Sequence, residues 1–223
     1  MTEAFAPAPA PSYRLIPSRF PPIGLFDTVA TAADAAAVME LAGWTNDRLV
    51  ADRIRRLPPD EWVYGRANAS VVMATFLHVP PGGARFNGPE LGAWYAAAAL
   101  PTAAFEVAHH LRREAVARRL PSLRRTYRTY RAELAGDYLD IRGQQARHAD
   151  LYAADSYATS QPWGEGVRAG GGAGILFDSI RHVGGLCAVA YRPRNIREVM
   201  QADHWEVSVE AATRRVGLRR LTA

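Results

Sequence analysis

The sequence contains no lysine, so all 27 of its basic residues are arginine. The absence of lysine excludes any mechanism that needs a Schiff-base lysine or a P-loop lysine. The planar guanidinium of arginine can bind a phosphate through two parallel hydrogen bonds, which suits a phosphate-bearing ligand. A coding bias that also explains the many alanines accounts for the same composition, and the sequence leaves both explanations open. The formal net charge of +5 favours an acidic partner or a nucleotide but is too small to indicate DNA binding.

The sequence also has little cysteine and no long apolar run. Cys187 is the single cysteine of the sequence, so no intramolecular disulfide can form, and we expect a reducing, cytoplasmic location. It lies in an apolar stretch, which predicts a buried and unreactive thiol. No apolar run reaches the roughly 18–20 residues of a membrane span, and the first residues lack the basic start and apolar stretch of a signal peptide. We therefore expect no membrane association.

Several common signatures of active sites are missing as well. The sequence has no Gly-x-Ser-x-Gly elbow, no glycine-rich dinucleotide fingerprint after a strand and no His-Glu-x-x-His motif. Glu106, His109 and His110 could place a carboxylate and an imidazole on one helix face. Because no third ligand accompanies them, we predict no metal site.

The 223 residues are enough for one domain with a well-buried core. Residues 1–22 are rich in proline and alanine, which predicts an extended arm that is either disordered or packed on the body or on a partner. The remaining pattern predicts two helices over residues 31–57 with a break near 43–47, a strand region over 61–79, a helix over 102–120, a hairpin over 127–142, helical residues at 144–154, a further element from Ser160, and strands over 175–177, 186–191 and 204–209. Regular strand–helix–strand units do not recur, so the pattern favours an α+β fold. We divide the chain into an N-terminal arm and helical segment (1–60) and a main domain (61–223), within one structural unit.

The most informative stretch lies between residues 80 and 111. A Gly-Gly turn precedes Arg85, and the apolar run that follows predicts a short strand containing Tyr95. A Pro-Thr pair then begins a helix with Glu106 in its first turn. This order suits a pocket that binds a phosphate-bearing ligand and acts on it with one carboxylate. The residue types alone allow a second interpretation, in which Arg85 and Glu106 form a structural ion pair and Tyr95 is a core aromatic.

This stretch resembles the RES domain, the toxin half of RES–Xre toxin–antitoxin pairs. The family pattern is matched by Gly82-Gly83-Ala84-Arg85-Phe86-Asn87, Trp94-Tyr95-Ala96 and Thr102-Ala103-Ala104-Phe105-Glu106. Its Pro-Ser-x-Arg turn corresponds to Phe177-Asp178-Ser179-Ile180-Arg181, where Asp178 replaces the usual proline, and Ala84 is an additional residue. The resemblance covers about residues 60–200. It implies an α+β fold with a compact two-sheet core and peripheral helices, similar to ADP-ribosyltransferase toxins.

The resemblance also implies the chemistry and the site. NAD would be the substrate, and its nicotinamide–ribose bond would break through an oxocarbenium-like state stabilised by Glu106. The other implied site residues are Arg85 and Arg66 on the pyrophosphate, Tyr95 stacked on the nicotinamide or ribose, Ser179 with Arg181 orienting Glu106 or a phosphate, and Asn195 as a further pocket residue. The partner would be an Xre-like antitoxin that covers or enters the pocket of a hetero-oligomer.

The acceptor of the ADP-ribosyl group remains open. Water would make the protein an NAD glycohydrolase, and inorganic phosphate, as a co-substrate, would make it an NAD phosphorylase. A host protein side chain would make it an ADP-ribosyltransferase. Outside the enzyme class, the same residues could form an arginine-rich regulatory module that binds a nucleotide without cleaving it.

Overall fold

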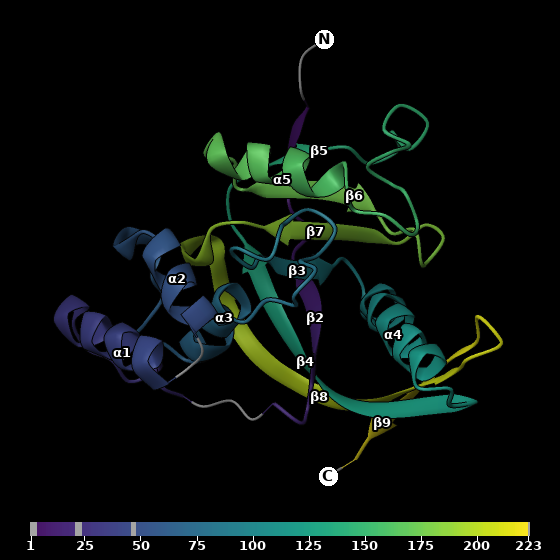
Figure 1. The fold of residues 1–223 in the computed structure, drawn as a ribbon, viewed down its shortest axis with the longest axis horizontal. Coiled ribbons are helices and arrows are strands. Elements are labelled where there is room, and N and C mark those ends of the chain that lie inside the picture. Colours follow the sequence, from purple (N-terminus) through teal and green to yellow (C-terminus); the bar gives the residue numbers. More distant parts are fainter. Residues whose placement is uncertain (1–3, 21–23, 46–47, 223) are drawn as a thin grey trace.

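The computed structural model describes residues 4–20, 24–45 and 48–222, and it has the expected α+β fold (Figure 1). The strands in this part of the chain are β1 (Phe5–Pro7), β2 (Ser12–Pro17), β3 (Trp94–Ala97), β4 (Ser122–Leu134), β5 (Asp137–Asp140), β6 (Gly174–Asp178), β7 (Leu186–Ala190), β8 (Ile196–Glu210) and β9 (Val216–Leu221). The helices are α1 (Ala32–Thr45), α2 (Arg48–Arg56), α3 (Ala69–Leu77), α4 (Leu100–Ala117) and α5 (Ser160–Ala169), with short 3₁₀ turns η1 (Pro59–Glu61) and η2 (Pro193–Asn195).

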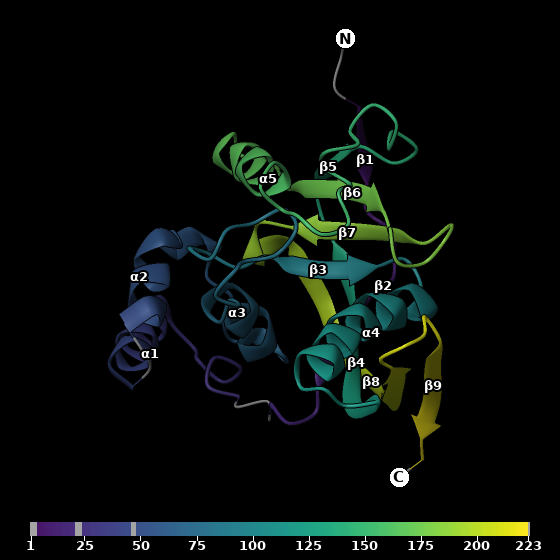
Figure 2. The same ribbon diagram turned by 45° about the vertical axis from the view of Figure 1, so that its right-hand side comes forward.

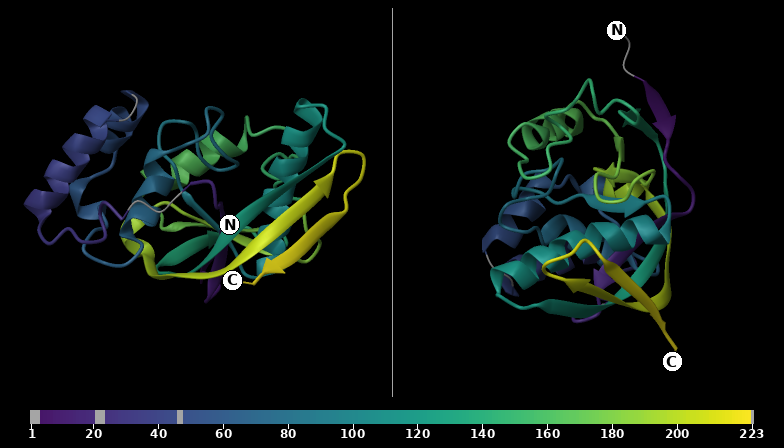
Figure 3. Two further views of the ribbon diagram at one scale, coloured as in Figure 1. Left: turned by 90° about the horizontal axis from the view of Figure 1, so that it is seen from below. Right: turned by 90° about the vertical axis from the view of Figure 1, so that its right-hand side faces the viewer.

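The described strands form one mixed sheet in the order β1-β5-β6-β7-β3-β2-β4-β8-β9. Its two halves meet at β2, which pairs with β3 at one position, Tyr13 opposite Ala97, but with β4 along its whole length. The long strands β4 and β8 curve past the shorter strands of the other half (Figures 1 and 3). The α+β fold is as expected, but the two-sheet core implied by the family resemblance is corrected to one continuous sheet, whose two halves meet at β2.

Two hydrophobic clusters lie on opposite sides of β3. Successive side chains of a strand point to opposite faces, so Trp94 and Ala96 join one cluster while Tyr95 and Ala97 pack with the other. Helices α1, α2 and α3 contribute to the first cluster, and α4 and α5 to the second. Figure 2 shows the same division, with α1, α2 and α3 grouped apart from α4. The sheet therefore has a buried face on each side, and the second cluster forms the floor of the candidate site.

The proline- and alanine-rich N-terminal segment packs on the body, one of the two expected alternatives. β1 forms an edge of the sheet beside β5, whereas β2 lies between β3 and β4. Leu15 in β2 is only 6% exposed and belongs to the second cluster. The boundary at residue 60 stays a prediction, but strands from before it complete the same sheet as strands from after it.

Residues 61–79 were expected to form a strand region, and this prediction is wrong: the segment contains helix α3. The Asp27 carboxylate accepts hydrogen bonds from the backbone N–H groups of Asn68 and Ser70, at 2.9 and 2.8 Å. A carboxylate at this place stabilises the start of a helix, because the first N–H groups have no partner within the helix. Nearly all of α3 is buried, and a short apolar run of this kind does not distinguish a buried strand from a buried helix.

Three other expectations about elements also need correction. The predicted hairpin over residues 127–142 does not form, because β4 pairs with β2 and β8 while β5 pairs with β1 and β6. Residues 144–154 form turns rather than a helix. The last predicted strand extends to fifteen residues as β8, and the arginine-rich end adds the edge strand β9. Partners distant in sequence determine the pairing of β4 and β5 and the length of β8, which pairs with β4.

The break predicted near residues 43–47 falls between α1 and α2, and residues 46–47 themselves lie outside the described residues. Within the described segments, no helix combines the length and the apolar character needed to cross a lipid bilayer.

Candidate functional site

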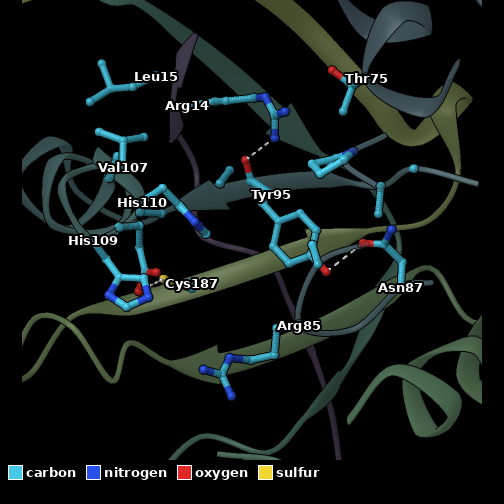
Figure 4. A pocket seen from close by; sticks show the side chains of 18 of the residues that line it. Arg14, Leu15, Thr75, Arg85, Asn87, Tyr95, Val107, His109, His110 and Cys187 are labelled. Carbon is cyan, nitrogen blue, oxygen red and sulfur yellow. Dashed lines mark hydrogen bonds between the residues drawn. The ribbon is translucent and has the colours of Figure 1, made fainter. Parts of the chain in front are cut away.

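A pocket of about 270 Å³ opens where β2, β3 and α4 meet the loop that follows α3. Its volume is near the lower end of small-molecule pockets, which measure roughly 300–1,000 Å³. The polar and ionisable side chains among its lining residues are Tyr13, Arg14, Thr75, His78, Arg85, Asn87, Tyr95, Glu106, His109, His110, Tyr157, Arg181 and Cys187. Figure 4 shows Tyr95 between Arg14 and Arg85, with His109 and Cys187 at the other side of the pocket. The structure therefore brings Arg85, Tyr95, Glu106 and Arg181 together, as the sequence predicted.

The turn before Arg85 depends on glycine at position 83. Gly83 has a φ of +69°, and a Cβ there would lie 2.9 Å from Gln161 Nε2 and closer still to the Asn87 carbonyl. Gln161 holds the same turn by donating hydrogen bonds to the carbonyls of Gly82 and Ala84, at 2.7 and 3.0 Å. The turn that contains the additional residue Ala84 is thus held by these two hydrogen bonds.

Arg85 is buried, with 8% of its surface exposed, and is fixed at one end of its guanidinium. Its Nη1 donates to the carbonyls of Leu151 and Ala153, at 2.9 and 3.0 Å, and its guanidinium lies 5.1 Å from the centre of the Tyr157 ring. Burial lowers the pKa of Arg85, but a guanidinium stays charged near neutral pH. Within the described part of the chain, no hydrogen bond uses Nε or Nη2 of Arg85. Those two donors are available to an anionic ligand in the pocket.

Tyr95 contributes its ring to the pocket and its hydroxyl to the neighbouring turn. Its Oη donates to Asn87 Oδ1 and accepts from the Phe86 backbone N–H, each at 2.9 Å. Burial raises the pKa of the Tyr95 phenol above its ordinary value, so the hydroxyl keeps its proton. The expected stacking role concerns the ring, and the hydroxyl adds a structural role that the sequence did not indicate.

Glu106 lies in the second turn of α4, not the first, because the helix already begins at Leu100. Its Oε1 accepts a hydrogen bond of 2.6 Å from Ser179 Oγ, and the Cys187 thiol lies 3.9 Å from the same oxygen. Burial raises the pKa of Cys187 well above its ordinary value, which keeps the thiol protonated. The thiol is buried, as predicted, and it also lines the pocket.

Ser179 and Arg181 belong to the turn between β6 and β7. Ser179 Oγ accepts from the backbone N–H groups of Arg181 and His182, at 3.1 and 3.0 Å. Arg181 Nη2 donates to the Ala154 carbonyl at 2.7 Å, which places its charge at the pocket. Asp178 stands where the family pattern has proline, and Ser179 still forms its hydrogen bond with Glu106.

The pocket is positively charged around Glu106. The pKa of His109 is lowered to about 4, first by burial and then by Arg181 and the neighbouring His110. Burial and the nearby Arg113 and Arg181 also lower the pKa of His110. Both imidazoles are therefore predominantly neutral at pH 7, and the arginines carry the positive charge. In the described segments, no group of three or more His, Cys, Asp or Glu side chains could hold a metal ion.

Arg14 is the main pocket residue that the sequence interpretation missed. Its Nη1 donates to the Tyr95 carbonyl at 2.9 Å, and its guanidinium lies 4.9 Å from the centre of the Trp94 ring. Burial lowers the pKa of Arg14 to about 10, so it is still charged at neutral pH. Its Nε is buried and has no hydrogen-bond partner within the described residues. An unpaired buried donor of this kind costs about 1–3 kcal/mol of stability.

Arg66 and Asn195 do not lie in the pocket. Arg66 Nη2 donates to the Ile196 carbonyl at 2.7 Å, in the segment before α3. Asn195 ends η2, where its carbonyl accepts from the Ala135 N–H at 2.8 Å. Arg66 was expected on a strand within residues 61–79, and the structure has no strand there. Arg14 lies on β2, which does line the pocket. The alternating residues of Ser12–Pro17 were the sequence signal for this strand, and the surrounding prolines obscured it.

The pocket thus offers one oriented carboxylate, several fixed guanidinium groups and an aromatic floor. Such a set can bind an anionic ligand and stabilise a positive charge that develops next to Glu106. Tyr157, whose ring packs on Arg85, is a second pocket residue that the sequence did not indicate.

Comparison with known proteins relates this chain to one family and to solved structures. The family described as RES domain matches residues 53–210. A chain from the crystal structure of the M. tuberculosis MbcT–MbcA toxin–antitoxin complex is 21% identical in sequence with a TM-score of 0.42, and the match covers 59% of the present chain and 74% of that chain. No functionally curated protein matches the sequence.

Proposed function

The chain belongs to the RES-domain family, and from this premise we propose that it is the toxin of a toxin–antitoxin pair that breaks the nicotinamide–ribose bond of NAD. The observation that carries the proposal is the Ser179–Glu106 hydrogen bond of 2.6 Å, in a pocket that Arg14, Arg85 and Arg181 also line. A carboxylate held in this way, among groups that bind phosphate, is what cleavage of a dinucleotide at its ribose requires.

Glu106 would stabilise the bond-breaking step. As the C–N bond breaks, its electron pair leaves with nicotinamide and positive charge develops on the ribose ring. Ser179 occupies Oε1 of Glu106, which leaves Oε2 to accept a hydrogen bond from a ribose hydroxyl and to face the developing charge. Because the Ser179 hydrogen bond fixes the carboxylate beforehand, little reorganisation is needed during the reaction.

The arginines would bind the pyrophosphate. Nε and Nη2 of Arg85 carry no hydrogen bond among the described residues and are the donors offered to the ligand, while Arg14 adds its charge to the pocket lining. The Tyr95 ring lies between these two arginines (Figure 4) and would support the nicotinamide riboside half of the ligand. The volume of about 270 Å³ suits that half, while the adenosine half would extend toward the mouth of the pocket.

Water or inorganic phosphate would complete the reaction by attacking the ribose carbon on the departure of nicotinamide. The arginines near His109 and His110 favour an anionic acceptor, which supports phosphate as a co-substrate. The same positive charge would attract the carboxylates of an Xre-like antitoxin, whose binding over the pocket would block NAD.

The deciding experiment measures nicotinamide release from NAD by the purified protein, with and without inorganic phosphate. We expect Glu106→Gln to lower the rate by roughly 10²–10³-fold, the effect of removing one preorganised charge-stabilising group. Glu206→Gln is the matched control, because Glu206 is a half-buried carboxylate of β8 that pairs with the exposed Arg219 and lies outside the pocket. Dependence on phosphate would identify the acceptor.

Two outcomes would redirect the proposal. Absence of nicotinamide release by folded, antitoxin-free protein would exclude hydrolysis and phosphorolysis. Labelled bands after incubation of a lysate with NAD labelled in its adenosine half would instead identify protein side chains as the acceptor.

A further inference from the structure

The turn that carries Ser179 is attached to the helix that carries Glu106. This turn joins β6 to β7 and is closed by hydrogen bonds from Ser179 N to the Gly185 carbonyl, at 2.8 Å, and from Gly185 N to the His182 carbonyl, at 2.9 Å. A Cβ on Gly185 would lie 2.7 Å from Thr102 Cγ2 and 3.0 Å from His182 Nδ1. The turn therefore lies so close to the Thr102 side chain at the start of α4 that a Cβ at position 185 would not fit without a shift.

The hydrogen-bond pattern fixes the direction of the Ser179 proton. A hydroxyl has one donor and two acceptor positions. Both acceptor positions of Ser179 Oγ are occupied by backbone N–H groups, from Arg181 and His182. The hydroxyl proton is thereby left to Glu106, and the position of this turn determines whether it reaches the carboxylate.

His182 is the side chain that connects the turn to the helix. Its Nδ1 lies 2.9 Å from Thr102 Oγ1, and its ring stacks on Phe105, with 4.7 Å between ring centres and 3° between ring planes. Thr102 is buried and Phe105 directly precedes Glu106, so both contacts are made to the part of α4 that positions the carboxylate. The backbone N–H of His182 thus binds Ser179, while its ring contacts the part of α4 that carries Glu106.

We propose that His182 is a positioning residue, which holds the Ser179 turn against α4 so that the serine hydroxyl orients the Glu106 carboxylate. His182 need not touch the substrate and does not line the pocket. Its role in turnover rests on the function proposed above, whereas its role in the geometry does not.

The kinetic test compares His182→Phe, which keeps the ring stack, with His182→Ala, which removes both contacts. Misplacement of a reacting group by about 1 Å can cost roughly 10²-fold, so we expect kcat for nicotinamide release to fall by up to about that factor in His182→Ala and by less in His182→Phe. KM for NAD should change little, because the arginines that bind the pyrophosphate are untouched. Thr102→Val, which removes the hydroxyl, should lower kcat about as much as His182→Phe does. Thr102→Ser, which keeps the hydroxyl, should retain the wild-type kcat. His204→Ala in β8 is the control for loss of a histidine elsewhere.

A double-mutant cycle separates positioning from a general loss of structure. If His182 acts through Ser179, then His182→Ala should cause no further loss of kcat in a Ser179→Ala background. Independent losses that multiply, or a rise in KM without a fall in kcat, would overturn the proposal.

Crystal structures of His182→Ala and Thr102→Ser decide the geometry without any assay. We expect the Ser179 Oγ–Glu106 Oε1 contact to be broken in His182→Ala and retained in Thr102→Ser. A contact retained at its present length in His182→Ala would overturn the proposal, even if the wild type proves inactive on NAD. An inactive wild type with the expected structural change would refute the proposed function alone.

Discussion

Tyr95 illustrates how one side chain serves both the pocket and the turn beside it. Its ring forms part of the pocket lining, while its hydroxyl bridges the Phe86 N–H and the Asn87 side chain. Asn87 in turn donates to the carbonyls of Gly88 and Leu91. The loop that presents Arg85 is therefore organised around polar groups that the Tyr95 hydroxyl satisfies.

Removing that hydroxyl should cost more than its small size indicates. Tyr95→Phe leaves the Phe86 N–H and Asn87 Oδ1 without their partner, and a buried unsatisfied group costs about 1–3 kcal/mol. We expect urea unfolding to show a loss of that size and KM for NAD to rise as Arg85 loses its support. Tyr64→Phe, in a half-buried tyrosine outside the pocket, is the control. Equal effects of the two substitutions would contradict this account.

His109 makes the stability of the fold depend on pH. A histidine in the unfolded chain has a pKa near 6.5, but burial, Arg181 and His110 lower the pKa of His109 to about 4. Between these values the unfolded chain binds the proton and the folded chain does not, so the free energy of unfolding falls as pH falls from 6.5 to 4.

His109→Asn should therefore lose less stability than the wild type over that range. Denaturant unfolding at several pH values measures the difference. At pH 8 the imidazole is neutral in both states, which gives the pH-independent effect of the substitution. Parallel curves for the two proteins between pH 6.5 and pH 4 would show that His109 does not carry this dependence.

The residues of the site were predictable where local sequence positions them. Arg85, Tyr95 and Glu106 follow one another through a turn, a strand and a helix, each with a local signal, and the structure brings them together. Arg14 reaches the pocket through a strand pairing with residues far along the chain, which no local pattern indicates. Arg66 was expected in the pocket because the apolar run within residues 61–79, which forms helix α3, was interpreted as a strand.

At the scale of elements, glycines control how closely turns approach their neighbours. Gly82 and Gly83 are adjacent and exposed or half-exposed, yet only Gly83 combines a positive φ with close backbone contacts. A Cβ at Gly82 meets nothing within 4 Å. The pair therefore offers a matched comparison within one turn.

We expect Gly83→Ala to destabilise the protein by about 1–3 kcal/mol, the cost of a non-glycine residue in the left-handed region, and more if the contacts cannot relax. Gly82→Ala should change stability by less than about 1 kcal/mol. Because the turn presents Arg85, Gly83→Ala should also raise KM for NAD, whereas Gly82→Ala should not. Urea unfolding and nicotinamide release measure both effects, and similar results for the two variants would argue against this role of the turn.

Elements were predictable where amphipathic spacing or caps specified them, as in α1, α2 and α4. Helix α3 was missed because seven of its nine residues are buried and because its start is stabilised by Asp27, about forty residues away in sequence. The expected hairpin failed for a related reason. β4 and β5 are neighbours in sequence but pair with strands from other parts of the chain.

At the scale of the whole molecule, the two halves of the sheet depend on β2. The residues that match the family begin at 53, yet β2 lies between β3 and β4 and supplies both Leu15 to the core and Arg14 to the pocket. Without it, β4 would lose a neighbour along six residues, and the two halves would lose the strand that joins them. We therefore expect this protein to require its N-terminal segment in order to fold.

Removal of β2 should cost far more than removal of β9, although both strands have six residues. A chain that begins at residue 18 exposes the backbone groups of two interior strands and part of the core, so we expect it to be unfolded by circular dichroism and inactive on NAD. A chain that ends at residue 213 loses an edge strand and should stay folded, with a lower unfolding midpoint. Because β2 associates through hydrogen bonds and apolar contacts, a peptide of residues 1–20 should restore structure to the first chain when added in excess. If the chain beginning at residue 18 folded and released nicotinamide by itself, neither the joining role of β2 nor the need for Arg14 in the pocket would stand.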